Sequence, residues 1–413
     1  MKKGVLGILV FLISLCFVAQ AFAFNAANRV TIAPNGEGDL LIFPAYFTGG
    51  GWENEVTLIN TSQTDSIAVH VAVRRAPDSA EKDFLVFLSP TDVFKMIIKQ
   101  NEQGVPVVET SDGSLVIRND CYTAADYVAA NDGQPYQLEL GPGWETGYIA
   151  AIAVAQTNLG APPVDKATIC NNYRTVMANI LPVGGWVIPD NVLTGTMEIY
   201  NTQTAVRGAI KAFALKDYDN FYAPNFGETL VIGQNANNSQ IEVDAALVND
   251  NVVVPYVGAP DGQTLFTATF PSVSGAYVGR TASYTLIDTE ERMGAFSPPP
   301  KVTFWEMTTI VFPQDTTWGE PISRGWVLVD YNGSIAAGVA ADGATAVAVN
   351  DGVPAIHTVM HTIFGGNAIQ GVGWFYAASQ MGNILYGGAP VSHYAPVNIP
   401  NPPCAPGAGF CNY

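Results

Sequence analysis

The chain has 413 residues and a formal net charge of −18 at pH 7; 48% of its residues are hydrophobic and 13% are charged. This composition excludes a disordered acidic chain, which would combine high charge with few apolar residues. Nucleic acid is not an expected partner, because binding phosphates requires clustered Lys and Arg, and here 18 Lys and Arg stand against 36 Asp and Glu. The length is sufficient for two hydrophobic cores.

The first 23 residues have the pattern of a secretory signal peptide. Lys2 and Lys3 precede an apolar run over Val5–Val18, and Ala21-Phe22-Ala23 follows as a small-residue cleavage signal. We predict that residues 1–23 are removed and that the mature chain has no membrane-spanning segment, because the apolar run is too short to cross a bilayer. The protein is then secreted, either to the cell surface and extracellular space or to the periplasm.

Four cysteines remain in the predicted mature chain. An even number of cysteines in an exported protein indicates disulfides. Three connectivities are possible, and proximity in the sequence favours two short-range pairs. The four residues are Cys121, Cys170, Cys404 and Cys411, with the predicted pairs Cys121–Cys170 and Cys404–Cys411.

The clearest local pattern lies over Val56–Val73, where apolar residues alternate on both sides of a polar turn. This period of two predicts a β-hairpin with one buried face. A looser copy runs from Met197 to Ala214, and an Asn-Thr pair, at Asn60 and Asn201, occupies the same place in both. We expect these asparagine side chains to close their turns by hydrogen bonding to the local backbone. The two copies suggest two related halves.

Similar strand patterns separated by turn residues continue along the chain, and no long amphipathic stretch predicts a long helix. The 40 glycines and 27 prolines are spread without a period, as in a loop-rich β protein. We therefore predict an all-β fold of two antiparallel β-sandwich domains, Ig-like or jelly-roll-like, with short helices only. A change of composition at Pro182–Asn191 marks the boundary. The expected parts are an extended arm over 24–38, a first domain over 39–185, a second over 186–395 and a Pro-rich, disulfide-tied tail over 396–413.

Two short patterns are weak candidates for metal binding. His357 and His361 are four residues apart, which places both rings on one face of either a strand or a helix. Asp217 and Asp219 offer alternating carboxylates that can bind calcium loosely, although the glycine and glutamate of an EF-hand loop are missing. No other cofactor is expected.

Catalytic motifs are missing from the sequence. It has no GxSxG, and its acids cannot be paired into a glycosidase site from the sequence alone. The candidate acids are Glu145, Glu290, Glu306 and Glu320, and the tryptophans that can stack on sugars are Trp144, Trp305, Trp318, Trp326 and Trp374.

Three functions follow as hypotheses. The first is an exported structural or interaction protein without catalysis, such as a surface-layer, filament or adhesin subunit, which associates with itself or with cell-envelope components. In that case the arm over 24–38 can add a strand to a neighbouring subunit. The second is a secreted carbohydrate-binding protein that uses exposed Trp and Tyr to bind glycans. The third is a secreted hydrolase or metal-binding protein.

Overall fold

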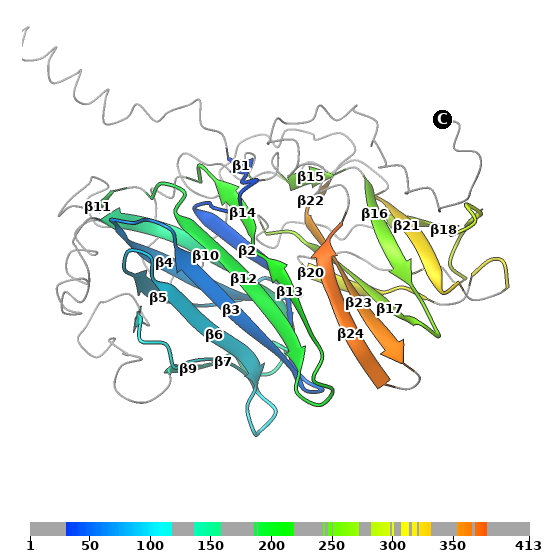
Figure 1. Ribbon diagram of the computed structural model, residues 1–413, viewed down its shortest axis with the longest axis horizontal. Helices are drawn as coiled ribbons and strands as arrows, with labels where there is room; N and C mark the ends of the chain where they lie inside the picture. The colour runs from blue at the N-terminus through cyan, green and yellow to red at the C-terminus, as the bar shows by residue number, and fades with distance from the viewer. Residues whose placement is uncertain are drawn as a thin grey trace, which may run out of the picture.

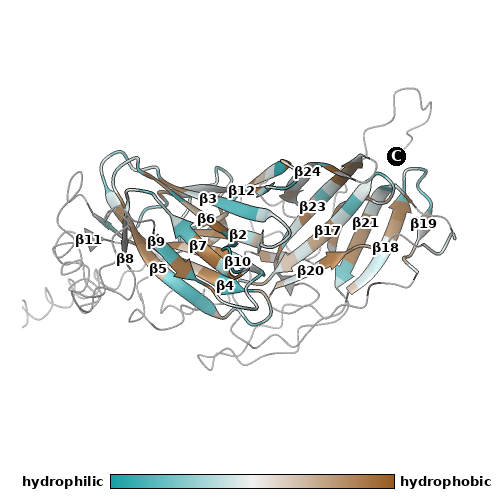
Figure 2. Ribbon diagram, turned by 90° about the horizontal axis from the view of Figure 1, so that it is seen from below, coloured by the Kyte–Doolittle hydropathy of each residue, from teal (hydrophilic) through white to brown (hydrophobic). Residues whose placement is uncertain are grey.

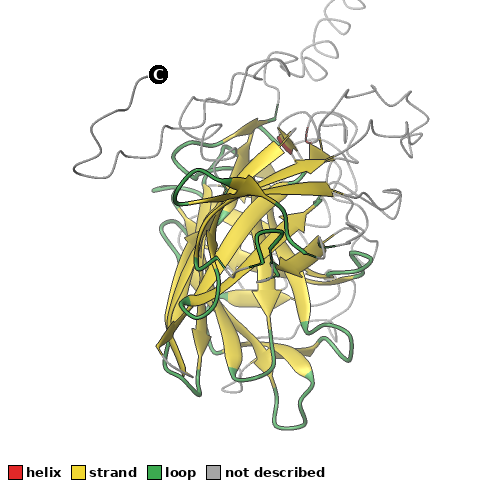
Figure 3. Cartoon of the chain, turned by 90° about the vertical axis from the view of Figure 1, so that its right-hand side faces the viewer, coloured by secondary structure: helices red, strands yellow, loops and turns green. Residues whose placement is uncertain are grey.

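A computed structural model shows an all-β protein, as predicted. It describes residues 30–117, 136–157, 186–187, 189–218, 243, 247–249, 251–271, 282–297, 300, 307–313, 316–319, 322–331, 353–365 and 368–377. Every element with bounds in this part of the chain is a β-strand in an antiparallel sheet (Figure 3). Two stacks of strands lie along the long axis of the molecule (Figure 1). No helix in the described ranges has the length and hydrophobicity needed to cross a membrane.

The first stack consists of two sheets. The larger, which we call sheet A, has the order β1-β14-β2-β10-β4-β5-β8, with β11 also paired to β10. Its strands are β1 (Thr31–Ile32), β2 (Leu40–Phe47), β4 (Ser66–Arg75), β5 (Glu81–Leu88), β8 (Leu115–Ile117), β10 (Thr146–Thr157), β11 (Trp186–Val187) and β14 (Phe213–Lys216). Sheet B has the order β13-β12-β3-β6-β7-β9. Its strands are β3 (Trp52–Asn60), β6 (Val93–Gln100), β7 (Pro106–Thr110), β9 (Tyr136–Glu139), β12 (Leu193–Asn201) and β13 (Arg207–Lys211).

The two sheets differ in how they are buried. In β3 and β12 of sheet B, buried residues alternate with partly exposed ones, because one face contacts the core and the other contacts solvent. In β2 and β4 of sheet A nearly every residue is buried, so both faces of this sheet are covered. Phe84 of β5 and Phe94 of β6 contact each other between the sheets, with ring centroids 6.4 Å apart. The face of sheet A that carries Phe84 is therefore the inner face.

The hairpin predicted over Val56–Val73 is wrong. Its first strand, β3, pairs with β12 and β6 in sheet B, whereas its second, β4, pairs with β10 and β5 in sheet A. The polar turn thus carries the chain from one sheet to the other. The later copy does form a hairpin, between β12 and β13, and it pairs with the first copy at Met197 and Val56. The two copies are neighbours in one sandwich.

The prediction for the two asparagines is confirmed. Asn60 Oδ1 accepts the backbone N–H of Ser62, and its amide donates to the carbonyls of Asp65 and Ser89. Asn201 Oδ1 accepts the N–H groups of Gln203 and Thr204. Asn60 is fully buried, and its bond to the Ser89 carbonyl links the turn between β3 and β4 to the end of β5.

Hydrogen bonding in the first sandwich continues across residue 186. Strand β12 pairs with β3, and β14 pairs with β2 and β1. The division into folding units at 185/186 stays a prediction, but the sheets themselves are completed only at Lys216. Residues 30–38 of the expected arm contact the first sandwich of their own chain. Thr31 pairs with Lys216, and the Thr194 hydroxyl donates to the Gly36 carbonyl. In the described structure these residues thus contact β14 and β12 of their own chain.

The second stack has two four-stranded sheets, ordered β16-β21-β18-β19 and β20-β17-β23-β24, and a separate pair, β15-β22. The strands are β15 (Val248–Asn249), β16 (Asn251–Val257), β17 (Gly262–Thr269), β18 (Ala282–Asp288), β19 (Met293–Gly294), β20 (Met307–Val311), β21 (Arg324–Tyr331), β22 (Val353–Pro354), β23 (Ile356–Gly365) and β24 (Ala368–Tyr376). Aromatic rings fill the space between its sheets: Phe296, Phe266 and Phe312 stack with centroids 5.4–5.9 Å apart.

The two sandwiches are joined through buried contacts. The core of the first sandwich also includes Met307, Ile356, Met360 and Trp374 from the second. Edge strands β13 and β24 lie side by side (Figure 1). The Tyr376 hydroxyl there donates to the Lys211 carbonyl, 2.5 Å away. The apolar junction indicates that the two stacks pack as one body.

Candidate functional site

The structure places the two predicted histidines on the same face of β23, where each has a separate partner. His357 is fully buried, stacks on Phe266 and shares a 2.8 Å hydrogen bond between its Nε2 and the Tyr331 hydroxyl. His361 Nε2 lies 2.8 Å from the carbonyl oxygen of Pro255, at the edge of the opposite sheet. This pair therefore holds the two sheets together.

The acidity of His357 follows from its burial. Desolvation lowers the pKa of this imidazole to about 3, so the ring is neutral at physiological pH. Unfolded histidine has a pKa of about 6.5 and takes up a proton first as the pH falls. Below pH 6.5 the unfolded state thus binds more protons than the folded state, and stability declines until the pH reaches the folded pKa.

We expect a change from pH 7 to pH 4.5 to cost the wild-type protein about 2–3 kcal/mol more than it costs His357→Phe, because each pKa unit is worth about 1.4 kcal/mol. The variant loses the hydrogen bond to Tyr331 and starts from a lower stability, but it has no proton to take up at this position. Urea unfolding at both pH values measures the difference. Equal pH dependence in the two proteins would contradict a buried neutral imidazole.

The other predicted site residues do not converge in the described part of the chain. Asp217 exchanges two hydrogen bonds with Asn191, which fix the turn before β12 to the end of β14. Asp219 lies outside the described residues, as do the predicted signal peptide, the tail and all four cysteines. Glu306 and Glu320 also lie outside them, and Glu145 and Glu290 are on different sandwiches.

Three of the candidate tryptophans are buried or lie under another side chain. Trp144 and Trp374 are only 5% and 7% exposed, and Arg292 lies over the ring of Trp318. Trp326 differs from them, with 38% of its surface exposed. It lies at a groove of about 360 Å³, where the lining also includes His361, Ile363 and the ion pair of Arg324 with Asp261.

Trp326 also belongs to a partly exposed apolar row on the outer sheet of the second sandwich. The register places Pro255 of β16 and Ile287 of β18 on either side of it, and Met293 of β19 beyond Ile287. The alternate residues, such as Val327 and Leu286, belong to the core, so the row faces away from it. Met293 is 69% exposed. We call these four side chains the apolar row; β18, β19 and β21 lie side by side at one end of the molecule (Figure 2).

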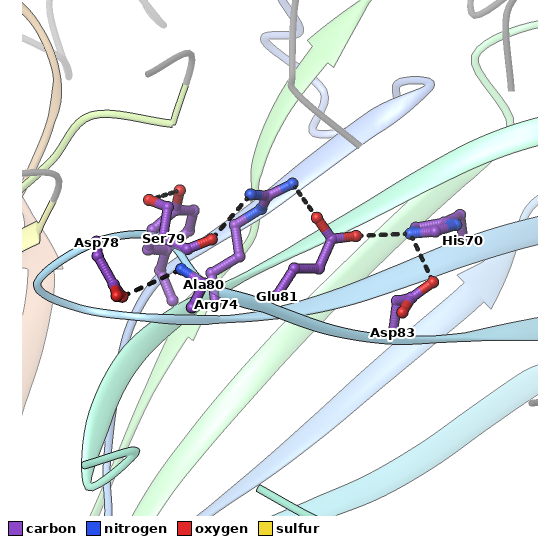
Figure 4. Close-up of polar contacts among 8 residues, drawn as sticks. His70, Arg74, Asp78, Ser79, Ala80, Glu81 and Asp83 are labelled. Atoms are coloured by element: carbon purple, nitrogen blue, oxygen red, sulfur yellow. Dashed lines mark hydrogen bonds and ion pairs between the residues drawn. The ribbon is translucent and has the colours of Figure 1, made fainter. Parts of the chain in front are cut away.

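A polar cluster that the sequence analysis missed lies on the outer face of sheet A. It consists of His70 and Arg74 of β4 with Glu81 and Asp83 of β5 (Figure 4). Because Val71 is opposite Phe84 in the inner-facing row, these four side chains point to the other face. Arg74 faces Glu81 across the strands, and Asp83 faces the small side chain of Ala72, which leaves room beside His70.

The contacts in this cluster are close and mostly buried. Arg74 donates to Glu81 Oε2 at 2.7 Å, and the other Glu81 oxygen lies 3.1 Å from His70 Nε2. The same His70 nitrogen lies 3.6 Å from Asp83 Oδ2. The side chains of His70, Arg74 and Glu81 are 3–5% exposed, and that of Asp83 is 29% exposed. Burial, with the nearby charge of Glu81, raises the pKa of Asp83, although His70 opposes this.

A sequence signal for the cluster existed in the spacing. Polar residues interrupt the apolar pattern at His70 and Arg74, and the Asp78 turn brings Glu81 and Asp83 back beside them. In an alternating strand such polar residues normally face solvent, so the pattern alone did not single them out. Comparison of the chain with known protein families, with curated proteins and with solved structures finds no match.

Proposed function

We propose that this chain is an exported, non-catalytic interaction protein of the cell surface, and that the apolar row is the surface through which copies of it associate. The observation that carries the proposal is the alignment of Pro255, Trp326, Ile287 and Met293 across four strands of one exposed sheet face. Aromatic and methionine side chains are enriched at the centres of protein interfaces, from which charged residues are depleted.

Self-association through this face agrees with the charges around it. Two ion pairs lie beside the row, Arg324 with Asp261 and Arg292 with Glu290. A surface with both signs of charge around an apolar centre can pack against its own copy, because each cation can meet an anion of the partner. The strong net negative charge of the chain opposes association elsewhere on its surface.

Sedimentation velocity over a range of protein concentrations tests this proposal. We expect the wild-type chain to self-associate, and Trp326→Ala to weaken the association about 30-fold or more, since a buried interface tryptophan typically contributes about 2 kcal/mol. Met293→Asp should have a similar effect. Val93→Asp is the matched control, because Val93 is an exposed apolar residue of sheet B, 41% exposed and remote from the row. A monomeric wild-type chain, or equal association of wild type and Trp326→Ala, would overturn the proposal.

Carbohydrate binding is the second candidate, favoured by the groove beside Trp326. An exposed indole can stack on a sugar ring while Arg324, Asp261 and His361 supply hydrogen-bonding groups. A glycan array followed by titration of tryptophan fluorescence distinguishes the candidates. A sugar ligand gives saturable binding that Trp326→Ala removes and Met293→Asp leaves unchanged. Export itself is tested by N-terminal sequencing of the exported protein, for which we expect Phe24 as the first residue.

A further inference from the structure

The polar cluster on sheet A has the composition of a metal site as well as that of an ion-pair network. One imidazole nitrogen and two carboxylates from neighbouring strands offer three ligand atoms, and all three lie within 4.8 Å of one another. Zinc bonds of about 2.0–2.2 Å at tetrahedral angles separate neighbouring ligand atoms by roughly 3.3–3.5 Å. The distances from His70 Nε2 to Glu81 Oε1 and to Asp83 Oδ2, 3.1 and 3.6 Å, lie on either side of this value.

A hydrogen bond from His70 Nε2 to Glu81 accounts for only one of the two carboxylates beside this nitrogen. This nitrogen faces two carboxylates, but its single N–H bond points in one direction and can donate well to only one of them. A cation between the three atoms interacts with both carboxylates at once.

Arg74 positions the cluster. Its guanidinium holds Glu81 Oε2 at 2.7 Å, so that the other oxygen of Glu81 is turned toward His70. Such outer contacts orient the ligands of metal sites. Arg74 also offsets one carboxylate charge, so the cluster with a neutral histidine carries one net negative charge, which attracts a cation.

We propose that His70 Nε2, Glu81 Oε1 and Asp83 Oδ2 bind one divalent transition-metal ion, best fitted by zinc, on the outer face of the first sandwich. Mixed nitrogen and carboxylate ligands suit zinc, whereas calcium requires six to eight oxygen ligands. Three protein ligands leave one position of a tetrahedron for water. Asp83, the most exposed of the three, lies on the side open to solvent.

The experiment uses the full chain, freed of metal by a chelator and titrated with Zn²⁺ by calorimetry, with metal content measured after gel filtration. We expect one zinc per chain and an affinity at least tenfold lower for Asp83→Asn and for His70→Gln. Asp78→Asn is the matched control, because Asp78 is a carboxylate of the turn between β4 and β5 that pairs with Arg75, outside the cluster.

Two outcomes would overturn the proposal: no saturable zinc uptake by the wild-type chain, or uptake by Asp83→Asn equal to that of Asp78→Asn. Circular dichroism shows whether each variant is folded. If His70→Gln does not fold, Asp83→Asn decides the matter, because Asp83 is partly exposed and its replacement conserves size. The inference is independent of the apolar row, and Trp326→Ala should bind zinc as the wild type does.

Discussion

Replacing Arg74 by methionine is expected to lower the free energy of unfolding by about 3–5 kcal/mol, because the buried Glu81 carboxylate would lose its 2.7 Å bond to the guanidinium. The Arg74 and Glu81 side chains are only 3% and 4% exposed, and 2.7 Å separates the bonded atoms. The guanidinium also donates to the backbone carbonyl of Ser79, which closes the turn between β4 and β5. Urea unfolding in a buffer with chelator measures the loss without any contribution from bound metal.

The neighbouring arginine provides the control. Arg75 pairs with Asp78 at the surface, where both side chains are substantially exposed, and exposed ion pairs add little to stability. Arg75→Met should therefore change stability far less than Arg74→Met. Adding Glu81→Gln to Arg74→Met should recover part of the loss, since it removes the charge left behind. A similar cost for the two arginine variants would show that solvent reaches the cluster freely.

Gly147→Ala is expected to destabilise the protein by about 3 kcal/mol or more, because the added methyl group has no room. A β-carbon at Gly147 would lie 1.9 Å from the carbonyl oxygen of Arg74 and 2.7 Å from the Tyr46 ring. The backbone of β4 cannot move aside without disturbing its pairing with β10, which already has a bulge between Gly147 and Ile149 on its β2 side.

The control for this substitution is Gly113→Ala. A β-carbon there meets no atom of the described residues within 4 Å, so stability should stay within about 0.5 kcal/mol of wild type, as for most surface changes. Thermal and urea unfolding of both variants test the difference. Wild-type stability in Gly147→Ala would mean that β4 and β10 are farther apart than their register requires.

The sequence predicted which residues of several strands face the core, but not which sheet each strand joins. Alternation over Val56–Val73 identified β3 and β4 as strands, because side chains of a strand point to opposite faces in turn. It carries no information on whether a polar turn folds a strand back beside its neighbour or across the core. In the structure the Asn60 amide bonds to the Ser89 carbonyl at the end of β5, a contact made only in the folded chain.

In the candidate sites, too, the sequence predicted the face on which a residue lies but not its partners on other strands. The spacing of His357 and His361 placed both rings on one face of either a strand or a helix, and the structure shows a strand. Tyr331 and the Pro255 carbonyl, which they contact, belong to other strands. The sequence pattern did not predict a site at His70. A polar residue in an alternating strand normally faces water, whereas both faces of β4 are buried here. Burial of the second face depends on tertiary packing, which the period of two cannot show.

Because Thr31 pairs with Lys216, the sheets of the first sandwich are complete only after the chain has been synthesised as far as Lys216. A nascent chain, or a proteolytic fragment, that ends before β12 leaves β3 with one unpaired edge, and before β14 it leaves β2 with another. Open edges of this kind attract strands of other molecules. Joining such distant segments is also slow, since the entropy of closing a long loop is lost before the contacts form. Until synthesis has passed Lys216, the chain therefore depends on being kept apart from its own copies.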